Sequence, residues 1–147
     1  MSLRKGRVGD GMSGDSRMLV GRRTEEGFVA NVVNHFEIHG TDGKKAQDFY
    51  AALFGWSIDA NNPMDYGMVS GEAGGIGGGI SKSMDGKPMV TVYVEVADLD
   101  ATLAKVQELG GTTVMPPADV PGGPRLAQFA DLDGNVIGLT QAGTMQS

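Results

Sequence analysis

The predicted secondary structure of this chain repeats itself, and the repeat restricts the possible folds more than any other feature. A shift of 56 residues places Asp42, which with Thr41 as the alternative is the expected N-cap of one helix, on Asp98, the expected N-cap of another. The glycines expected to end these helices, Gly55 and Gly110, lie 55 residues apart. Each copy has the order strand, helix and three further strands. The sequence therefore predicts an internal βαβββ duplication.

Both copies are predicted from their hydrophobic patterns. Strands are expected where apolar and polar residues alternate, or where short β-rich runs lie between turns; helices are expected where apolar residues recur at helical spacing. The predicted strands are residues 31–39, 56–59, 66–70 and 76–81 in the first copy and 89–96, 112–115, 126–130 and 136–140 in the second. The predicted helical stripes are Ala46, Phe49, Tyr50, Leu53 and Phe54 in the first copy and Leu99, Leu103 and Val106 in the second, with Leu109 as a further candidate. In each copy the first strand is expected to pack its apolar face under the helix, so its polar face should line a cavity shared by both sheets.

The composition limits the class of protein. The 147 residues suffice for one domain, which we expect over residues 29–143, after a basic Gly/Ser/Arg-rich leader (1–28) that we expect to be poorly ordered and before a short tail (144–147). The absence of cysteine excludes disulfides, cysteine-based zinc sites and thiol nucleophiles. No apolar run predicts a secretory signal or a membrane span. The net charge of −6 argues against nucleic-acid binding. We expect a cytoplasmic protein with neither nucleic acid nor membrane as partner.

Five segments carry a resemblance to a known family. They are N-H-F-E-I-H-G-T-D (34–42), F-Y-A-A-L-F-G-W (49–56), the valine strand with A-D-L-D (90–100), L-G-G (109–111) and D-L-D-G-N-V-I-G-L (131–139). In this order they resemble the vicinal oxygen chelate superfamily of glyoxalases, bleomycin-resistance proteins and extradiol dioxygenases. The resemblance implies an α+β fold in which two βαβββ modules form a half-open barrel around a cleft. It also implies a homodimer.

The metal site of that family is largely missing from this chain. The resemblance implies four inward-facing His or Glu ligands on the first, fourth, fifth and eighth strands. His35 matches the first position, but Thr91 and Gly138 occupy the fifth- and eighth-strand positions, and the fourth strand contains no carboxylate or imidazole. Since a catalytic metal generally needs about three protein ligands, we expect no bound metal and no other cofactor.

Several residues remain as candidates for chemistry in a metal-free cleft. His35 and Glu37 share the polar face of the first strand, where His35 is a candidate general base. Glu37 is expected to orient His35 or to act directly, with a raised pKa if the pocket is dry. The candidate ligand-binding residues are Thr91, Tyr93, Trp56, Tyr66 and Arg125. A structural alternative stays open for three of these residues: packing for His35 and Trp56, and a solvated loop position for Arg125.

These residues leave three hypotheses for the function. The first is a metal-free protein that binds a small, planar or aromatic molecule. The alternative is a lyase or isomerase that acts on a small carbonyl compound through acid–base chemistry at His35 and Glu37. The third is a divalent-metal-dependent glyoxalase or dioxygenase. Substituting His35 by alanine discriminates the first two, because an enzyme would lose turnover whereas a binding protein would lose only affinity.

Overall fold

Eight strands and two helices follow one another in the order that the repeat predicts. The structure is a computed structural model that describes residues 30–71 and 75–145, and the fold lies in the unit formed by residues 33–147. The elements of the first copy are β1 (Val32–Gly40), α1 (Gly43–Phe54), β2 (Ile58–Asp59), β3 (Gly67–Val69) and β4 (Gly77–Lys82). Those of the second are β5 (Met89–Val96), α2 (Leu99–Glu108), β6 (Thr112–Asp119), β7 (Arg125–Ala130) and β8 (Val136–Gln141). The predicted α+β class and the βαβββ order are confirmed. The predicted leader (1–28) lies outside the described residues.

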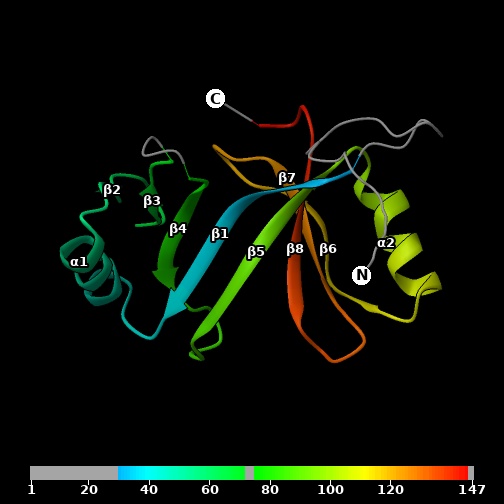
Figure 1. Cartoon of the computed structure of the whole chain (residues 1–147), viewed down its shortest axis with the longest axis horizontal. Coiled ribbons are helices and arrows are strands. Elements are labelled where there is room, and N and C mark those ends of the chain that lie inside the picture. The colour runs from blue at the N-terminus through cyan, green and yellow to red at the C-terminus, as the bar shows by residue number, and fades with distance from the viewer. Residues whose placement is uncertain (1–29, 72–74, 146–147) are drawn as a thin grey trace, which may run out of the picture. The chain divides into compact units, whose positions relative to one another are not determined.

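The strands form one sheet in which the two copies meet along their first strands. The strand order is β2-β3-β4-β1-β5-β8-β7-β6, so β1 and β5 are neighbours, as expected from the duplication. Within each copy the first strand runs parallel to the last, β1 with β4 and β5 with β8. In Figure 1, α1 lies beside the β2–β4 end of this sheet and α2 beside the β6–β8 end. Because β2 and β6 are edges, the sheet stays open.

The predicted helix caps are confirmed. The side chain of Asp42 accepts a hydrogen bond from the backbone N–H of Lys45, and that of Asp98 accepts one from Ala101. Gly55 ends α1 in the left-handed region at a φ of 71°. This conformation suits glycine because it has no Cβ.

Helix α2 packs Leu99 and Leu103 of its predicted stripe into a core, whereas Leu109, beyond the end of the helix, is 66% exposed. The buried residues of this core are Val96, Leu99, Leu103, Ala127 and Leu139, and Val94 and Phe129 pack against them. The core joins α2 to the faces of β5, β7 and β8 that carry these residues. Burying side chains of this size stabilises a fold by roughly 1.5–3 kcal/mol each.

Helix α1 departs from the expectation that both helices bury their apolar stripes. Phe49, Leu53 and Phe54 are 60%, 59% and 55% exposed, and the buried residue of α1 is the polar Gln47. The Gln47 amide donates hydrogen bonds to the backbone carbonyls of Asp65 and Ile80. Helix α1 packs against β4, in which three of the six residues are glycine, so this strand offers α1 fewer large side chains than the core around α2 contains.

Two strands differ in length from their predictions. Strand β6 was predicted over residues 112–115 but continues through Pro116 and Pro117 to Asp119. Proline lacks a backbone donor and is tolerated at a sheet edge, where β6 lies, and the pairing of β6 with β7 shifts register on both sides of Met115. Strand β2, predicted over 56–59, comprises only Ile58–Asp59.

One observation concerns membranes. Within residues 30–71 and 75–145, neither helix has the length and apolar character needed to cross a bilayer.

Candidate functional site

A buried carboxylate lies at the junction of the two copies. Glu37 of β1 is buried, and its Oε1 accepts hydrogen bonds from His39 Nε2 at 2.7 Å and from the Tyr93 hydroxyl at 3.1 Å. Its Oε2 accepts a hydrogen bond from the Tyr66 hydroxyl at 2.9 Å. These donors come from β1, from β5 and from the segment before β3, so Glu37 connects three parts of the chain.

The hydrogen bonds to Glu37 keep this carboxylate ionised. Burial alone raises its pKa, but hydrogen bonds from His39 and Tyr66 and the proximity of both imidazoles bring the pKa below the usual glutamate value. The sequence-based expectation of a raised pKa is therefore wrong, because it considered burial without these donors. Conversely, burial and the Glu37 charge raise the pKa of Tyr66 and of Tyr93, so both hydroxyls keep their protons.

The two tyrosines extend the hydrogen-bonded group at either end. The Tyr66 hydroxyl lies 2.8 Å from His35 Nε2, and the Tyr93 hydroxyl accepts a hydrogen bond from Gln128 Nε2 at 3.3 Å. The His35 ring stacks on Tyr66 at an interplanar angle of 13° and meets Tyr93 edge-on at 75°. Burial lowers the pKa of His35, and the nearby Glu37 charge opposes this only in part. His35 is therefore neutral near pH 7. We call the residues that share this network the polar cluster, which comprises His35, Glu37, His39, Tyr66, Tyr93 and Gln128.

Both tyrosine rings lie over glycines of neighbouring strands. Gly79 of β4 pairs with Glu37, and Gly138 of β8 pairs with Tyr93. A Cβ at Gly79 would overlap the ring and hydroxyl of Tyr66, and a Cβ at Gly138 would overlap the ring of Tyr93. The two glycines provide the space that lets the hydroxyls reach Glu37.

This arrangement does not fit the metal site of the family that the sequence resembles. Gly138, at the eighth-strand ligand position, is covered by Tyr93. Thr91, at the fifth-strand position, is buried and donates its hydroxyl proton to the Val136 carbonyl at 2.7 Å. In the part of the chain that the structure describes, no group of three or more His, Cys, Asp or Glu side chains is arranged to hold a metal ion.

The structure brings together only some of the predicted site residues. The polar cluster contains four of them: His35, Glu37, Tyr66 and Tyr93. The Thr91 hydroxyl instead donates a hydrogen bond to a backbone carbonyl of the neighbouring strand β8. Two further candidates lie elsewhere. Trp56 packs against the rings of Phe36, Tyr50 and Phe54, and Arg125 lies 3.7 Å from Asp119 and 4.0 Å from Asp100.

Two members of the polar cluster, His39 and Gln128, were not among the predicted site residues. His39 binds Glu37, and the available signal was its position two residues further along the same face of β1. No sequence pattern indicated Gln128, because its hydrogen bond to the Tyr93 hydroxyl depends on the strand order, in which β7 lies beside β8 and β8 beside β5. Tyr66 was expected to hold a ligand through its ring, and its hydrogen bond to Glu37 was not foreseen.

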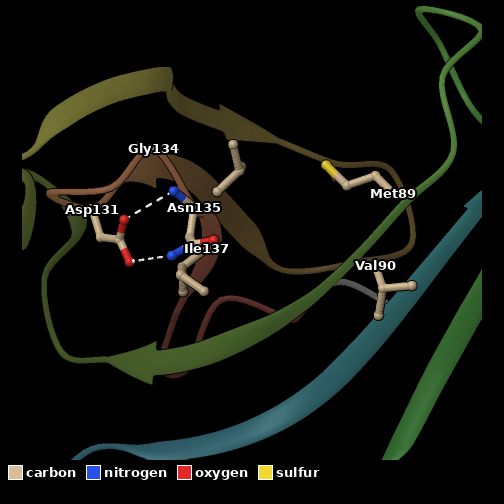
Figure 2. A pocket seen from close by; sticks show the side chains of 7 residues that line it. Met89, Val90, Asp131, Gly134, Asn135 and Ile137 are labelled. Atoms are coloured by element: carbon tan, nitrogen blue, oxygen red, sulfur yellow. Dashed lines mark hydrogen bonds between the residues drawn. The ribbon is translucent and has the colours of Figure 1, made fainter.

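A pocket of about 470 Å³ lies apart from the polar cluster, beside the β7–β8 turn (Figure 2). Its lining residues are Met89, Val90, Asp131, Gly134, Asn135, Val136 and Ile137. The Asp131 carboxylate accepts hydrogen bonds within its own turn, from the backbone N–H groups of Asp133 and Asn135 and from the Asn135 side chain. None of the predicted site residues lines this pocket. Its one carboxylate is already engaged, so we place the candidate chemistry at the polar cluster.

Comparison with known proteins identifies one matching family and relatives of similar sequence. The sequence model of the Glyoxalase/Bleomycin resistance protein/Dioxygenase superfamily matches residues 32–139. "Putative glyoxylase CFP32" of Mycobacterium tuberculosis is 33% identical over 118 residues, covering 74% of this chain and 45% of the relative. "Anthracycline biosynthesis protein DauV" of Streptomyces sp. (strain C5) is 29% identical over 147 aligned residues, covering 81% of this chain and 50% of the relative. The chain thus spans about half the length of these relatives.

Solved structures with the same fold have much lower sequence identity. Methylmalonyl-CoA epimerase from Mycobacterium tuberculosis superposes with a TM-score of 0.59 at 17% identity, over 74% of this chain and 86% of the other. A glyoxalase/bleomycin resistance protein/dioxygenase superfamily member from Vibrio splendidus 12B01 gives 0.54 at 15% identity, over 76% and 98%. At such identities the likeness establishes the fold alone.

Proposed function

The chain belongs to the Glyoxalase/Bleomycin resistance protein/Dioxygenase superfamily, and on that premise we propose that it binds a small planar or aromatic molecule at the polar cluster without a bound metal ion. The ligand would lie against the rings of His35 and Tyr66, which are half-buried, while Glu37 and Tyr93 beneath them are buried. Flat aromatic ligands suit such a surface, because rings stack on rings and polar edges supply hydrogen bonds.

The observation that carries the proposal is the position of the two tyrosine rings. Tyr66 covers Gly79 and Tyr93 covers Gly138, and both hydroxyls bind Glu37. A metal ligand introduced at either glycine would have to displace a ring and break a hydrogen bond to an ionised carboxylate. The same rings give the site an aromatic character that a metal centre does not need.

The name of one relative supports the choice of ligand class. DauV is named as a protein of anthracycline biosynthesis. Anthracyclines contain a planar, hydroxylated anthraquinone. A dihydroxyanthraquinone with free phenol groups, such as anthraflavic acid, is therefore a suitable first probe.

Titration of the full chain with anthraflavic acid, followed by absorbance and by calorimetry, tests the proposal. We expect saturable binding that weakens at least about tenfold when His35 is replaced by alanine, since that change removes both ring contact and a hydrogen bond. Val90→Ser is the matched control, because Val90 lines the separate pocket and is 72% exposed. Absence of saturable binding, or binding that V90S weakens and H35A does not, would contradict the proposal.

A second candidate function rests on His35. Its imidazole is neutral because burial lowers its pKa. Its Nε2 atom is hydrogen-bonded to the Tyr66 hydroxyl, which in turn donates a hydrogen bond to Glu37. Such an imidazole is suited to remove a proton in a lyase or isomerase step on a small carbonyl compound. Glu37 is a poor base, because three donors occupy its oxygens. If the protein is an enzyme, H35A abolishes turnover of a carbonyl substrate; if it only binds, H35A lowers affinity and no turnover is found in the wild type.

A further inference from the structure

We propose that Tyr66 holds His35 in the tautomer that carries its proton on Nε2, so that the ligand must present a hydrogen-bond donor to Nδ1 of His35. Tyr66 is then a positioning residue that acts through His35. The tautomer follows from the hydrogen-bond geometry around an ionised Glu37 and a neutral His35, whereas the ligand preference also rests on the proposed function, which places the ligand at the polar cluster.

The direction of the hydrogen bonds starts at Glu37. An ionised carboxylate can only accept, so each of its partners must donate. The Tyr66 hydroxyl, 2.9 Å from Oε2, therefore points its single proton at Glu37. The reverse orientation would place a hydroxyl lone pair against a buried negative charge, which is unfavourable in a medium of low dielectric constant.

The orientation of the Tyr66 hydroxyl determines which atom donates in its hydrogen bond with His35. With its proton committed to Glu37, the Tyr66 oxygen has only lone pairs for the Nε2 atom of His35, 2.8 Å away. A contact this short requires a proton between the two atoms, and this proton must belong to Nε2. The two rings are nearly parallel, at an interplanar angle of 13° with their centroids 6.4 Å apart, so the hydrogen bond runs close to the plane of the imidazole, where the N–H points.

The remaining nitrogen of His35 is consequently an acceptor. A neutral imidazole carries one proton, so Nδ1 has a free lone pair. Within residues 30–71 and 75–145, every hydrogen bond of the His35 ring is made by Nε2. A phenol O–H or an amine N–H satisfies Nδ1, whereas a carbonyl or ether oxygen in the same place would face lone pair against lone pair. A mismatch of this kind at a buried polar group lowers affinity by about tenfold or more.

Nitrogen-15 NMR of the uniformly labelled full chain reads the tautomer directly. The chain has only two histidines, so their two-bond proton–nitrogen patterns are readily assigned with the help of the H35A variant. We expect His35 to show a protonated Nε2 and an unprotonated Nδ1 near pH 7. A proton on Nδ1 of His35 in the wild type would overturn the inference whatever any ligand does.

The Glu37→Gln variant reverses the chain of hydrogen bonds. The amide oxygen of the introduced glutamine can accept the hydrogen bonds from His39 and Tyr93, and its NH₂ group then donates a hydrogen bond to the Tyr66 oxygen. Tyr66 must turn and donate to His35 Nε2, which moves the His35 proton to Nδ1. Tyr93→Phe is the control, because it removes a donor to Oε1 and leaves the Tyr66–Glu37 bond intact. An unchanged tautomer in a folded E37Q, or a changed one in Y93F, would overturn the inference; if E37Q fails to fold, the wild-type spectrum still decides.

Paired ligands test the second half of the proposal. Anthraflavic acid can donate to Nδ1, and its dimethyl ether has the same ring system without the donors. We expect the wild type to prefer the phenol by at least about tenfold and E37Q to lose this preference. Equal affinities in the wild type would overturn the inference and leave the proposed function standing. Binding of neither compound would instead count against the proposed function, while the NMR result would still decide the tautomer.

Discussion

Replacing Gly79 by alanine places a methyl group where the Tyr66 ring now lies. Gly79 is buried in β4 and pairs with Glu37 of β1, and a Cβ there would overlap the ring and hydroxyl of Tyr66. The backbone of β4 cannot move aside easily, because β1 and β3 pair with it on both sides. The expected response is displacement of Tyr66 from Glu37.

The cost follows from two contributions. Forcing an extra methyl group into a packed site costs about 1–3 kcal/mol. Loss of the Tyr66 hydrogen bond to the ionised Glu37 costs a further ~1.5–3 kcal/mol. We therefore expect Gly79→Ala to lower the free energy of unfolding by about 2.5–6 kcal/mol, a large share of the roughly 5–15 kcal/mol that stabilises a typical domain.

Urea denaturation followed by circular dichroism and by fluorescence of the single tryptophan, Trp56, measures this change. Gly75→Ala is the matched control: a Cβ at Gly75 meets open space, so its effect should stay within about 0.5 kcal/mol. In a Tyr66→Ala background the ring is gone, and we expect the Gly79 substitution to cost less than about 1 kcal/mol, a coupling typical of residues in contact. A Gly79 variant as stable as the Gly75 variant, or one whose cost is the same with and without Tyr66, would refute the placement of the ring.

Three further predictions concern α1, α2 and the polar cluster. Gln47→Leu leaves two backbone carbonyls without their donor and should lower the free energy of unfolding by about 1–3 kcal/mol, whereas Asp48→Ala, on the exposed side of α1, should change it by less than about 0.5 kcal/mol in the same urea assay. Asp98→Ala removes the N-cap of α2 and should cost about 1 kcal/mol; no change in the urea midpoint would show that the cap contributes nothing. The hydrogen bond to Glu37 raises the pKa of His39 above 6.5, so its stabilisation is fully present below pH 6.5 and is lost as the pH rises through the folded-state pKa. The stability difference between the wild type and His39→Gln should accordingly be larger near pH 5.5 than near pH 8.5, and an equal difference would contradict the assignment.

The sequence predicted those parts of the fold that depend on local patterns. The caps Asp42 and Asp98 and the terminating Gly55 follow from rules that act within one helical turn. The pairing of β1 with β5 followed from the duplication, since equivalent strands of two like modules meet at their junction. The packing of α1 was not predictable in this way. Its apolar residues recur at helical spacing as those of α2 do, and the difference lies in the partner strand, since three of the six residues of β4 are glycine.

The site was predicted in part for a related reason. Alternation along β1 placed His35 and Glu37 on one face, which the structure confirms through their shared partner Tyr66. Gly138 was identified from the sequence as a position without a metal ligand, and Gly79 belongs to a predicted strand that contains no carboxylate or imidazole. Their role as space for aromatic rings depends on which side chain crosses from the next segment, and a strand pattern does not contain that information.

The central claim is that tyrosine hydroxyls satisfy Glu37 where the family's metal site would otherwise lie, and metal titration of the full chain tests it most directly. Calorimetric titration with Zn²⁺, Ni²⁺, Mn²⁺ and Fe²⁺ should show no stoichiometric site tighter than micromolar, because among residues 30–71 and 75–145 no three His, Cys, Asp or Glu side chains are arranged around one ion. A tight one-to-one site that disappears in the His35→Ala variant would contradict the account.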